Sequence, residues 1–189
     1  MKEPGPLEDL ERALAGAETI VAGITPGQWT AATPCDGLDV RGVVSHLVTG
    51  NLRFAALARG NPAPAGDDLL GDDPAGAFSR AAAELAAALG APGALDEVYK
   101  APWGRATPGS VLAQVRITEQ LGHGWDLARA TGQPVPFPAD LAERTLATAR
   151  MTLSSRPEGP GAPFGPAVPV PDSAPAIDRL AGFLGRAVA

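Results

Sequence analysis

Cysteine is almost absent from this 189-residue chain, in which Cys35 is the single example. One cysteine excludes an internal disulfide and any metal site built from a cysteine cluster. A lone cysteine can act as a nucleophile, but it is more often a small buried hydrophobic residue. We therefore favour a packing role for Cys35.

The sequence also lacks a basic stripe and a long apolar run. The net charge is −6 and the isoelectric point is about 4.9, which argues against binding nucleic acid by neutralising phosphates. No apolar run approaches the ~18–20 residues that a membrane-spanning helix needs, and the acidic N-terminus is unlike a secretory signal. We expect a cytoplasmic protein that binds neither nucleic acid nor membrane.

Proline and glycine are plentiful, at 20 and 23 residues, but they are unevenly distributed. They gather at 57–76, 90–109, 132–138 and 156–175, and stretches rich in Ala, Leu and Val lie between these clusters. Such clusters separate regular elements, and the length suits one core. We predict a single domain over 1–189, with a core bundle over about 5–152 and a proline-rich stretch and terminal helix over 156–189.

The spacing of apolar residues predicts an all-α fold. Helices are expected at 7–23, 40–58, 74–89, 108–131, 138–153 and 174–186. Their expected N-caps include Asp39, either Asp72 or Asp73, and Ser173. A short extended piece is expected around Val98. Helices of this length joined by loops favour a helical bundle.

Histidine occurs only twice, and the two positions are informative. His46 and His123 each lie in a predicted helix, and Glu119 precedes His123 by four residues, on the same helix face. If the helices 40–58 and 108–131 are neighbours, these three side chains converge. Imidazole and carboxylate ligands suit Zn²⁺, Fe²⁺ or Ni²⁺, and three protein ligands leave a position for water or substrate. The pattern predicts a divalent-metal site.

Other interpretations of these residues remain open. Glu119 and His123 can form a simple surface pair, while His46 is an ordinary core histidine. Asp126 can orient a ligand histidine, or it can bond the backbone or Arg129. Gly122 and Gly124, which flank His123, indicate close approach of either a neighbouring helix or a ligand.

Two further side chains have weaker signals. Trp125 is expected to pack in the core rather than to recognise a substrate. Arg105 lies in a loop that could cover the site, where it could meet an anionic substrate, but a solvated loop arginine is the simpler interpretation.

Several motifs, taken in order, resemble those of the DinB-like superfamily. The resemblance is strongest to the N-terminal domain of mycothiol-dependent maleylpyruvate isomerase and to related actinobacterial metal-binding proteins. The motifs are Thr33-Pro34-Cys35 with Val40-Arg41, His46-Leu47, Glu119-x-x-x-His123-x-Trp125-Asp126-Leu127-Ala128 with Ala130-Thr131-Gly132, Phe164-Gly165-Pro166 with Val168-Pro169-Val170-Pro171, Asp178-Arg179-Leu180, and Gly185-Arg186.

The resemblance implies a DinB-like four-helix bundle with additional short C-terminal helices. It implies a metal, usually zinc, held by His46, Glu119 and His123, with mycothiol as a cosubstrate in several relatives. The implied activity is a thiol-dependent transferase or isomerase acting on a small electrophile, and a homodimer is compatible with the family. The isomerase has a separate C-terminal domain with no visible counterpart here, so no catalytic arginine can be assigned.

Two alternatives to an enzyme follow from the same motifs. One is a non-catalytic metal-binding or stress-associated protein, in which the metal stabilises the bundle or reports metal supply. The other is a metal-free helical interaction domain, for which both histidines would be dispensable.

Overall fold

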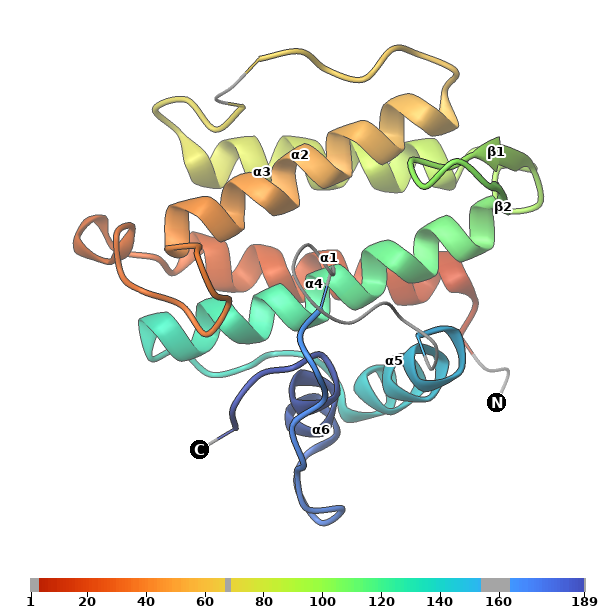
Figure 1. The fold of residues 1–189 in the computed structure, drawn as a ribbon. Coiled ribbons are helices and arrows are strands. Elements are labelled where there is room, and N and C mark those ends of the chain that lie inside the picture. The colour runs from red at the N-terminus through yellow and green to blue at the C-terminus, as the bar shows by residue number, and fades with distance from the viewer. Residues whose placement is uncertain (1–3, 67–68, 154–163, 189) are drawn as a thin grey trace.

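The computed structural model describes residues 4–66, 69–153 and 164–188, and over these residues the fold is predominantly helical (Figure 1). The elements are α1 (Pro6–Ala22), a 3-10 turn η1 (Pro26–Gln28), α2 (Val40–Ala58), α3 (Pro74–Leu89), β1 (Val98–Lys100), β2 (Ala106–Pro108), α4 (Gly109–Thr131), α5 (Ala139–Thr152) and α6 (Ala176–Phe183). The predicted all-α class is confirmed, and most helix ends fall within two residues of the prediction.

Capping side chains set the starts of α2 and α3. The carboxylate of Asp39 accepts a hydrogen bond from the Gly42 N–H at 2.8 Å, and that of Asp73 accepts one from the Gly76 N–H at 2.9 Å. Asp73, rather than Asp72, is therefore the cap of α3. Each bond satisfies one backbone donor that a helix N-terminus leaves unpaired.

The predicted start of the last helix was wrong. Ser173 does not cap α6, because residues 171–174 form a turn in which the Ala174 N–H bonds to the Pro171 carbonyl at 3.0 Å. The helix begins at Ala176, after Pro175, whose carbonyl accepts bonds from the N–H groups of residues 178 and 179. The start of the helix therefore lies after Pro175, whose ring fixes the backbone there, and not after Ser173.

Helices α1–α4 form the four-helix bundle. Helix α1 packs against α3 and α4, and α2 also packs against α3 and α4. The cyclic order is therefore α1–α3–α2–α4, and Figure 1 shows α2 and α3 lying above α1 and α4. Apolar side chains of all four helices fill the interior, among them Leu10, Ile20, Leu47, Phe78, Leu85, Leu112 and Leu121.

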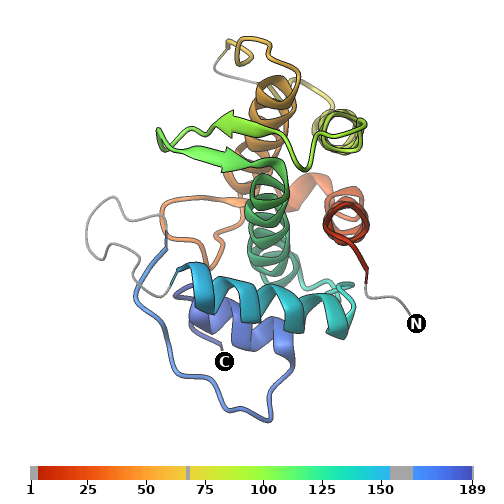
Figure 2. The ribbon, with the colours of Figure 1, turned by 90° about the vertical axis from the view of Figure 1, so that its right-hand side faces the viewer.

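Helices α5 and α6 pack against each other and against α4, on the side of α4 away from α2 and α3 (Figure 2). Helix α4 is thus covered from both sides, and every residue from Gln120 to Ala128 is buried. A Cβ atom at Gly124 would lie 2.4 Å from the Phe137 ring, and one at Gly122 would lie 2.9 Å from Leu184. Neighbouring side chains, not a ligand, explain these two glycines.

A short antiparallel hairpin precedes α4. The extended piece expected around Val98 exists, and its partner strand pairs Val98 with Pro108 and Tyr99 with Thr107. Arg105 is exposed in the turn of this hairpin, where its carbonyl accepts a hydrogen bond from the Ala101 N–H at 3.0 Å. Among the described helices, none is both long and apolar enough to cross a membrane.

Candidate metal centre

Helices α2 and α4 bring the three predicted ligand side chains together. His46 lies on α2, whereas Glu119 and His123 lie one turn apart on α4. The Nε2 atom of His46 is 2.7 Å from Glu119 Oε2, and Nε2 of His123 is 3.6 Å from the same oxygen. The ring centroids of the two histidines are 4.8 Å apart. All three donor atoms lie within 4.8 Å of one another.

These separations suit a single divalent ion. Metal–nitrogen and metal–oxygen bonds of about 2.0–2.2 Å imply donor atoms about 3–3.6 Å apart in a tetrahedral site. The Glu119–His123 distance lies at this limit, whereas the shorter His46–Glu119 distance is that of a hydrogen bond.

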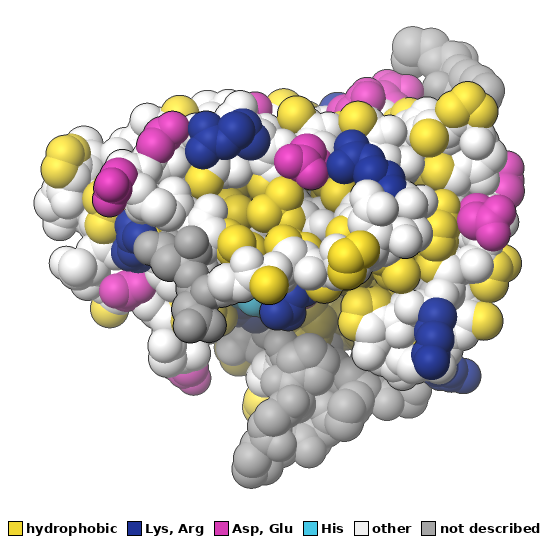
Figure 3. Space-filling view, turned by 90° about the horizontal axis from the view of Figure 1, so that it is seen from above, with side chains coloured by type: hydrophobic (Ala, Val, Ile, Leu, Met, Phe, Trp, Pro, Cys, Tyr) yellow, Lys and Arg dark blue, Asp and Glu magenta, His cyan; other side chains and the backbone are white. Residues whose placement is uncertain are grey.

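The site is closed on the α4 side and open on the α2 side. The His46 side chain is 46% exposed, whereas those of Glu119 and His123 are 15% and 9% exposed. In the space-filling view, histidine surface is visible beside a cationic side chain in a hollow of this face (Figure 3). An ion held here would have one side facing solvent, which suits exchange of a water or substrate ligand.

The charges of Glu119 and His123 support each other. Burial would raise the pKa of Glu119, but the hydrogen bonds with His123 and His46 and the nearby charges of His123 and Arg116 hold it well below its usual value. Burial would likewise lower the pKa of His123, but its bonds with Asp126, Cys35 and Glu119 raise it well above 6.5. Both shifts favour the charged forms, a carboxylate at Glu119 and an imidazolium at His123.

A buried arginine that the sequence analysis missed lies behind Glu119. Arg116 is 3% exposed, and its Nη1 is 4.0 Å from Glu119 Oε2. Its Nε and Nη2 donate to Asn51 Oδ1 at 3.3 and 3.0 Å, and Nη2 also donates to the Leu47 carbonyl at 3.3 Å. Gln120 Nε2 donates to the same Asn51 oxygen at 2.9 Å.

Two features show how α2 accommodates this guanidinium. A Cβ atom at Gly50 would lie 2.5 Å from Arg116 Nη1, so the absence of a side chain provides the space. Asn51 Nδ2 and Gln120 Oε1 are buried without a hydrogen-bond partner among the described residues. Gly50 was the signal available in the sequence, because a glycine inside a helix often marks a close approach of another group.

Asp126 orients His123, as one of the two interpretations of Asp126 predicted. Its Oδ2 is 3.0 Å from His123 Nδ1. Its other partner is Arg186, which donates through Nε to Oδ1 at 3.1 Å and through Nη2 to Oδ2 at 2.8 Å. The alternative prediction, a bond between Asp126 and Arg129, was wrong. The guanidinium of Arg129 instead lies 5.6 Å from the centre of the Trp125 ring. Burial would raise the pKa of Asp126, but His123 and Arg186 lower it overall.

Cys35 packs against the core, as expected, but it also lies beside the site. Its side chain is partly buried, and its sulfur, His123 and Asp126 form a second group of donor atoms within 4.8 Å. The Thr33 hydroxyl fixes this loop by accepting from the Cys35 N–H at 3.1 Å and donating to the Leu38 carbonyl at 2.7 Å. The contact with His123 depends on how the 24–38 segment folds back, which no local pattern indicates.

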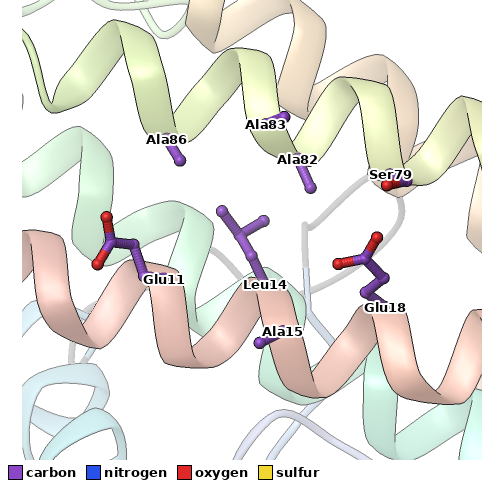
Figure 4. A pocket seen from close by; sticks show the side chains of 8 residues that line it. All are labelled: Glu11, Leu14, Ala15, Glu18, Ser79, Ala82, Ala83 and Ala86. Carbon is purple, nitrogen blue, oxygen red and sulfur yellow. The ribbon is translucent and has the colours of Figure 1, made fainter.

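A separate hollow of about 210 Å³ lies between α1 and α3, on the opposite side of the bundle (Figure 4). Leu14 points toward the alanines of α3, and the carboxylates of Glu11 and Glu18 lie on either side of it. The lining residues are Glu11, Leu14, Ala15, Glu18, Ser79, Ala82, Ala83 and Ala86. They include no metal-binding histidine or cysteine, so this hollow is not the candidate centre.

Comparison with known proteins gives the family. Residues 10–128 match the model of the mycothiol maleylpyruvate isomerase N-terminal domain. The chain belongs to this family. The match includes His46, Glu119, His123 and Asp126 and ends before α5 and α6.

Two curated relatives and two solved structures are also similar to this chain. The uncharacterized proteins MT0763 and Rv0738, from two strains of Mycobacterium tuberculosis, are each 34% identical over 97% of this chain and 98% of their own length. A crystal structure of the mycothiol-dependent maleylpyruvate isomerase matches 75% of this chain with a TM-score of 0.60 and 15% identity. A histidine-to-alanine mutant of that enzyme matches 82% of this chain, also at 15% identity, with a TM-score of 0.62.

The matched isomerase structures are longer than this chain. The chain covers 66% of the first isomerase chain, just under two thirds of its length, and 72% of the mutant chain. At 15% identity these likenesses establish a shared fold, which confirms the DinB-like bundle.

Proposed function

We propose that this protein binds one divalent metal ion, zinc by preference, and uses a low-molecular-weight thiol such as mycothiol in a transferase or isomerase reaction on a small electrophile. The observation that carries the proposal is the convergence of His46, Glu119 and His123 within 4.8 Å at a solvent-open edge of the bundle. Membership of the mycothiol maleylpyruvate isomerase family supports the choice of thiol.

Each residue of the site has a distinct part in this proposal. His46, Glu119 and His123 would hold the ion, and Asp126 would keep the His123 ring turned so that Nε2 faces the other two ligands. A bound zinc ion would supply Lewis-acid chemistry that lowers the pKa of a thiol. Arg116 keeps Glu119 ionised and in place, and the exposure of His46 leaves access for a thiol and its reaction partner. In this proposal the bundle and the C-terminal helices act as one domain.

The first test is elemental analysis of protein purified without chelators, wild type beside His46→Ala, Glu119→Ala and His123→Ala. About one equivalent of zinc in the wild type, lost in each variant, supports the site. Calorimetric titration of the zinc-loaded protein with mycothiol then tests the thiol. A wild type that neither contains nor takes up a divalent metal would contradict the proposal.

A non-catalytic metal-binding protein is the second candidate, because an ion held by His46, Glu119 and His123 would link α2 to α4 without any substrate. In that case zinc still binds to the three ligands, but mycothiol produces no binding heat and no change in the zinc-loaded protein. The thiol titration therefore separates the two functions.

A further inference from the structure

We propose that Arg186, near the end of the described chain, is a positioning residue for the candidate metal centre and acts on His123 through Asp126. The inference rests on the proposed function. It extends the site beyond residues 10–128, the part that matches the family domain, into the C-terminal segment.

The turn after α6 aims Arg186 at the site. Gly185 has a φ of +93°, a conformation that favours glycine. The N–H of Gly185 bonds to the Gly182 carbonyl and that of Arg186 bonds to the Ala181 carbonyl, each at 3.0 Å, which ends the helix in a left-handed turn. A Cβ at Gly185 would also lie 2.8 Å from the Cα of Gly165, so both shape and space require glycine here.

The segment is docked directly beside His123. Leu184 is fully buried, and its Cδ1 occupies the space that a Cβ at Gly122 would need, since the two would be 2.9 Å apart. Gly122 is the neighbour of His123 in the chain. On the same side of α4, Trp125 Nε1 donates to Asp178 Oδ1 of α6 at 2.7 Å. The tail therefore has two anchors on α4 besides Arg186.

Arg186 and Asp126 form a two-pronged buried ion pair. Asp126 is fully buried and Arg186 is 7% exposed, and Nε and Nη2 each bond one carboxylate oxygen. The Leu184 carbonyl accepts a third bond, from Nη1, at 2.8 Å. A planar guanidinium held at three points fixes the plane of the carboxylate, which a lysine could not do.

This carboxylate in turn fixes the ring of His123. Asp126 Oδ2, which Arg186 Nη2 bonds at 2.8 Å, is also the oxygen that accepts from His123 Nδ1 at 3.0 Å. With Nδ1 bonded to Asp126, Nε2 is the nitrogen that faces Glu119 and would bind the ion. Loss of Arg186 would leave Asp126 free to turn and the His123 ring poorly aligned, so the effect should appear in metal affinity as well as in folding.

The experiment measures zinc affinity by competition with a chelator in Arg186→Ala, Arg186→Lys and Asp126→Asn. Removal of a partner of a ligand histidine typically weakens metal binding about 10–100-fold. We expect about 10-fold or more for Arg186→Ala, a smaller loss for Arg186→Lys, and a double variant Arg186→Ala/Asp126→Asn no weaker than Asp126→Asn alone. The last result would show that Arg186 acts through Asp126.

Matched controls are Arg179→Ala and Asp178→Asn. Arg179 joins α6 to Glu143 of α5, and Asp178 joins α6 to Trp125, but neither contacts His123. Both should lower the melting temperature of the metal-free protein while leaving zinc affinity within about threefold of wild type. Arg186→Lys keeps a charge at the site and provides a folded variant if Arg186→Ala unfolds.

Three outcomes are distinguishable. Zinc affinities of the Arg186 variants that equal the wild-type value, with only the melting temperature lowered, would make Arg186 a structural residue and overturn this inference alone. Weakening of equal size in the Arg179 and Asp178 controls would also overturn it. A wild type that binds no zinc overturns both this inference and the proposed function.

Discussion

The α2–α4 edge of the bundle and the α1–α3 edge opposite it contain helices of similar length but bury different side chains. The α1–α3 edge is lined by alanine methyl groups and leaves a hollow, with carboxylates at its margins. The α2–α4 edge buries Arg116, Asn51, Gln120, His123 and Asp126. Buried polar groups cost free energy unless they are paired, so the α2–α4 edge depends on specific partners where the α1–α3 edge depends on apolar contact.

The largest effect on stability is expected from removing Arg116, the buried arginine of the α2–α4 edge. Arg116→Ala removes the guanidinium that bonds Asn51 Oδ1 and the Leu47 carbonyl and lies beside Glu119, and we expect a loss of about 3–5 kcal/mol in the free energy of unfolding. Urea denaturation measures it. The control is Glu18→Gln on the α1–α3 edge, expected to change stability by less than about 0.5 kcal/mol; equal losses at the two edges would contradict the contrast.

Gly50→Ala tests how tightly the α2–α4 edge encloses Arg116. Its added methyl would meet the Arg116 guanidinium at 2.5 Å, and overpacking of this kind costs about 1–3 kcal/mol, more than the roughly 1 kcal/mol that alanine gains over glycine in a helix. The matched control is Gly42→Ala in the same helix, where the nearest side-chain atom is 3.1 Å away. A Gly50→Ala protein as stable as Gly42→Ala in thermal unfolding would argue against a tightly enclosed Arg116.

The pH dependence of stability in the metal-free protein should also come from the α2–α4 edge. The pKa of His123 is raised in the folded state, so its stabilising contribution is complete below about pH 6.5, the unfolded value, and is lost as the pH rises through the folded pKa. Glu119 has a lowered pKa, so its contribution is present above about pH 4.3 and is lost in acid.

The contribution of His123 to stability is measured by the midpoints of urea denaturation of the metal-free protein between pH 6 and 9. We expect stability to fall over this range, and to fall less in His123→Ala. Zinc should reverse the trend, because ligand deprotonation makes metal binding stronger as pH rises. A flat profile in the metal-free wild type would contradict the assigned charges.

The smallest effect on stability is expected at the α1–α3 edge. Ala86→Leu would place a larger side chain in the hollow between α1 and α3, and cavity filling of this kind typically adds about 0.5–2 kcal/mol. We expect a gain near the lower end, measured by urea denaturation, with zinc affinity unchanged. A change in zinc affinity would show that the two edges are coupled.

Local patterns predicted the helices and the three ligand candidates because their signals are local. The apolar spacing, the Asp39 cap and the Glu119–His123 interval are each contained in one helix. The convergence of His46 with the α4 pair required only that two helices be neighbours.

The remaining parts of the site depend on contacts between distant segments. Arg186 reaches Asp126 across 60 positions, and Phe137 fills the space beside Gly124. Neither residue has a periodic signal that points to its partner. Ser173 was an equally plausible cap by composition, but the turn at 171–174 placed it outside α6. Tertiary packing and proline geometry decided these points.

The burial of α4 from Gln120 to Ala128 has a consequence for how the molecule opens. Amide protons in such a doubly covered segment exchange with solvent only through near-global unfolding, whereas partly exposed segments exchange through local opening. His123 lies within this segment and Glu119 directly precedes it, while His46 projects from the exposed edge of α2. For the proposed metal centre, we therefore expect an ion to enter and leave past His46, with the α4 donors held in place.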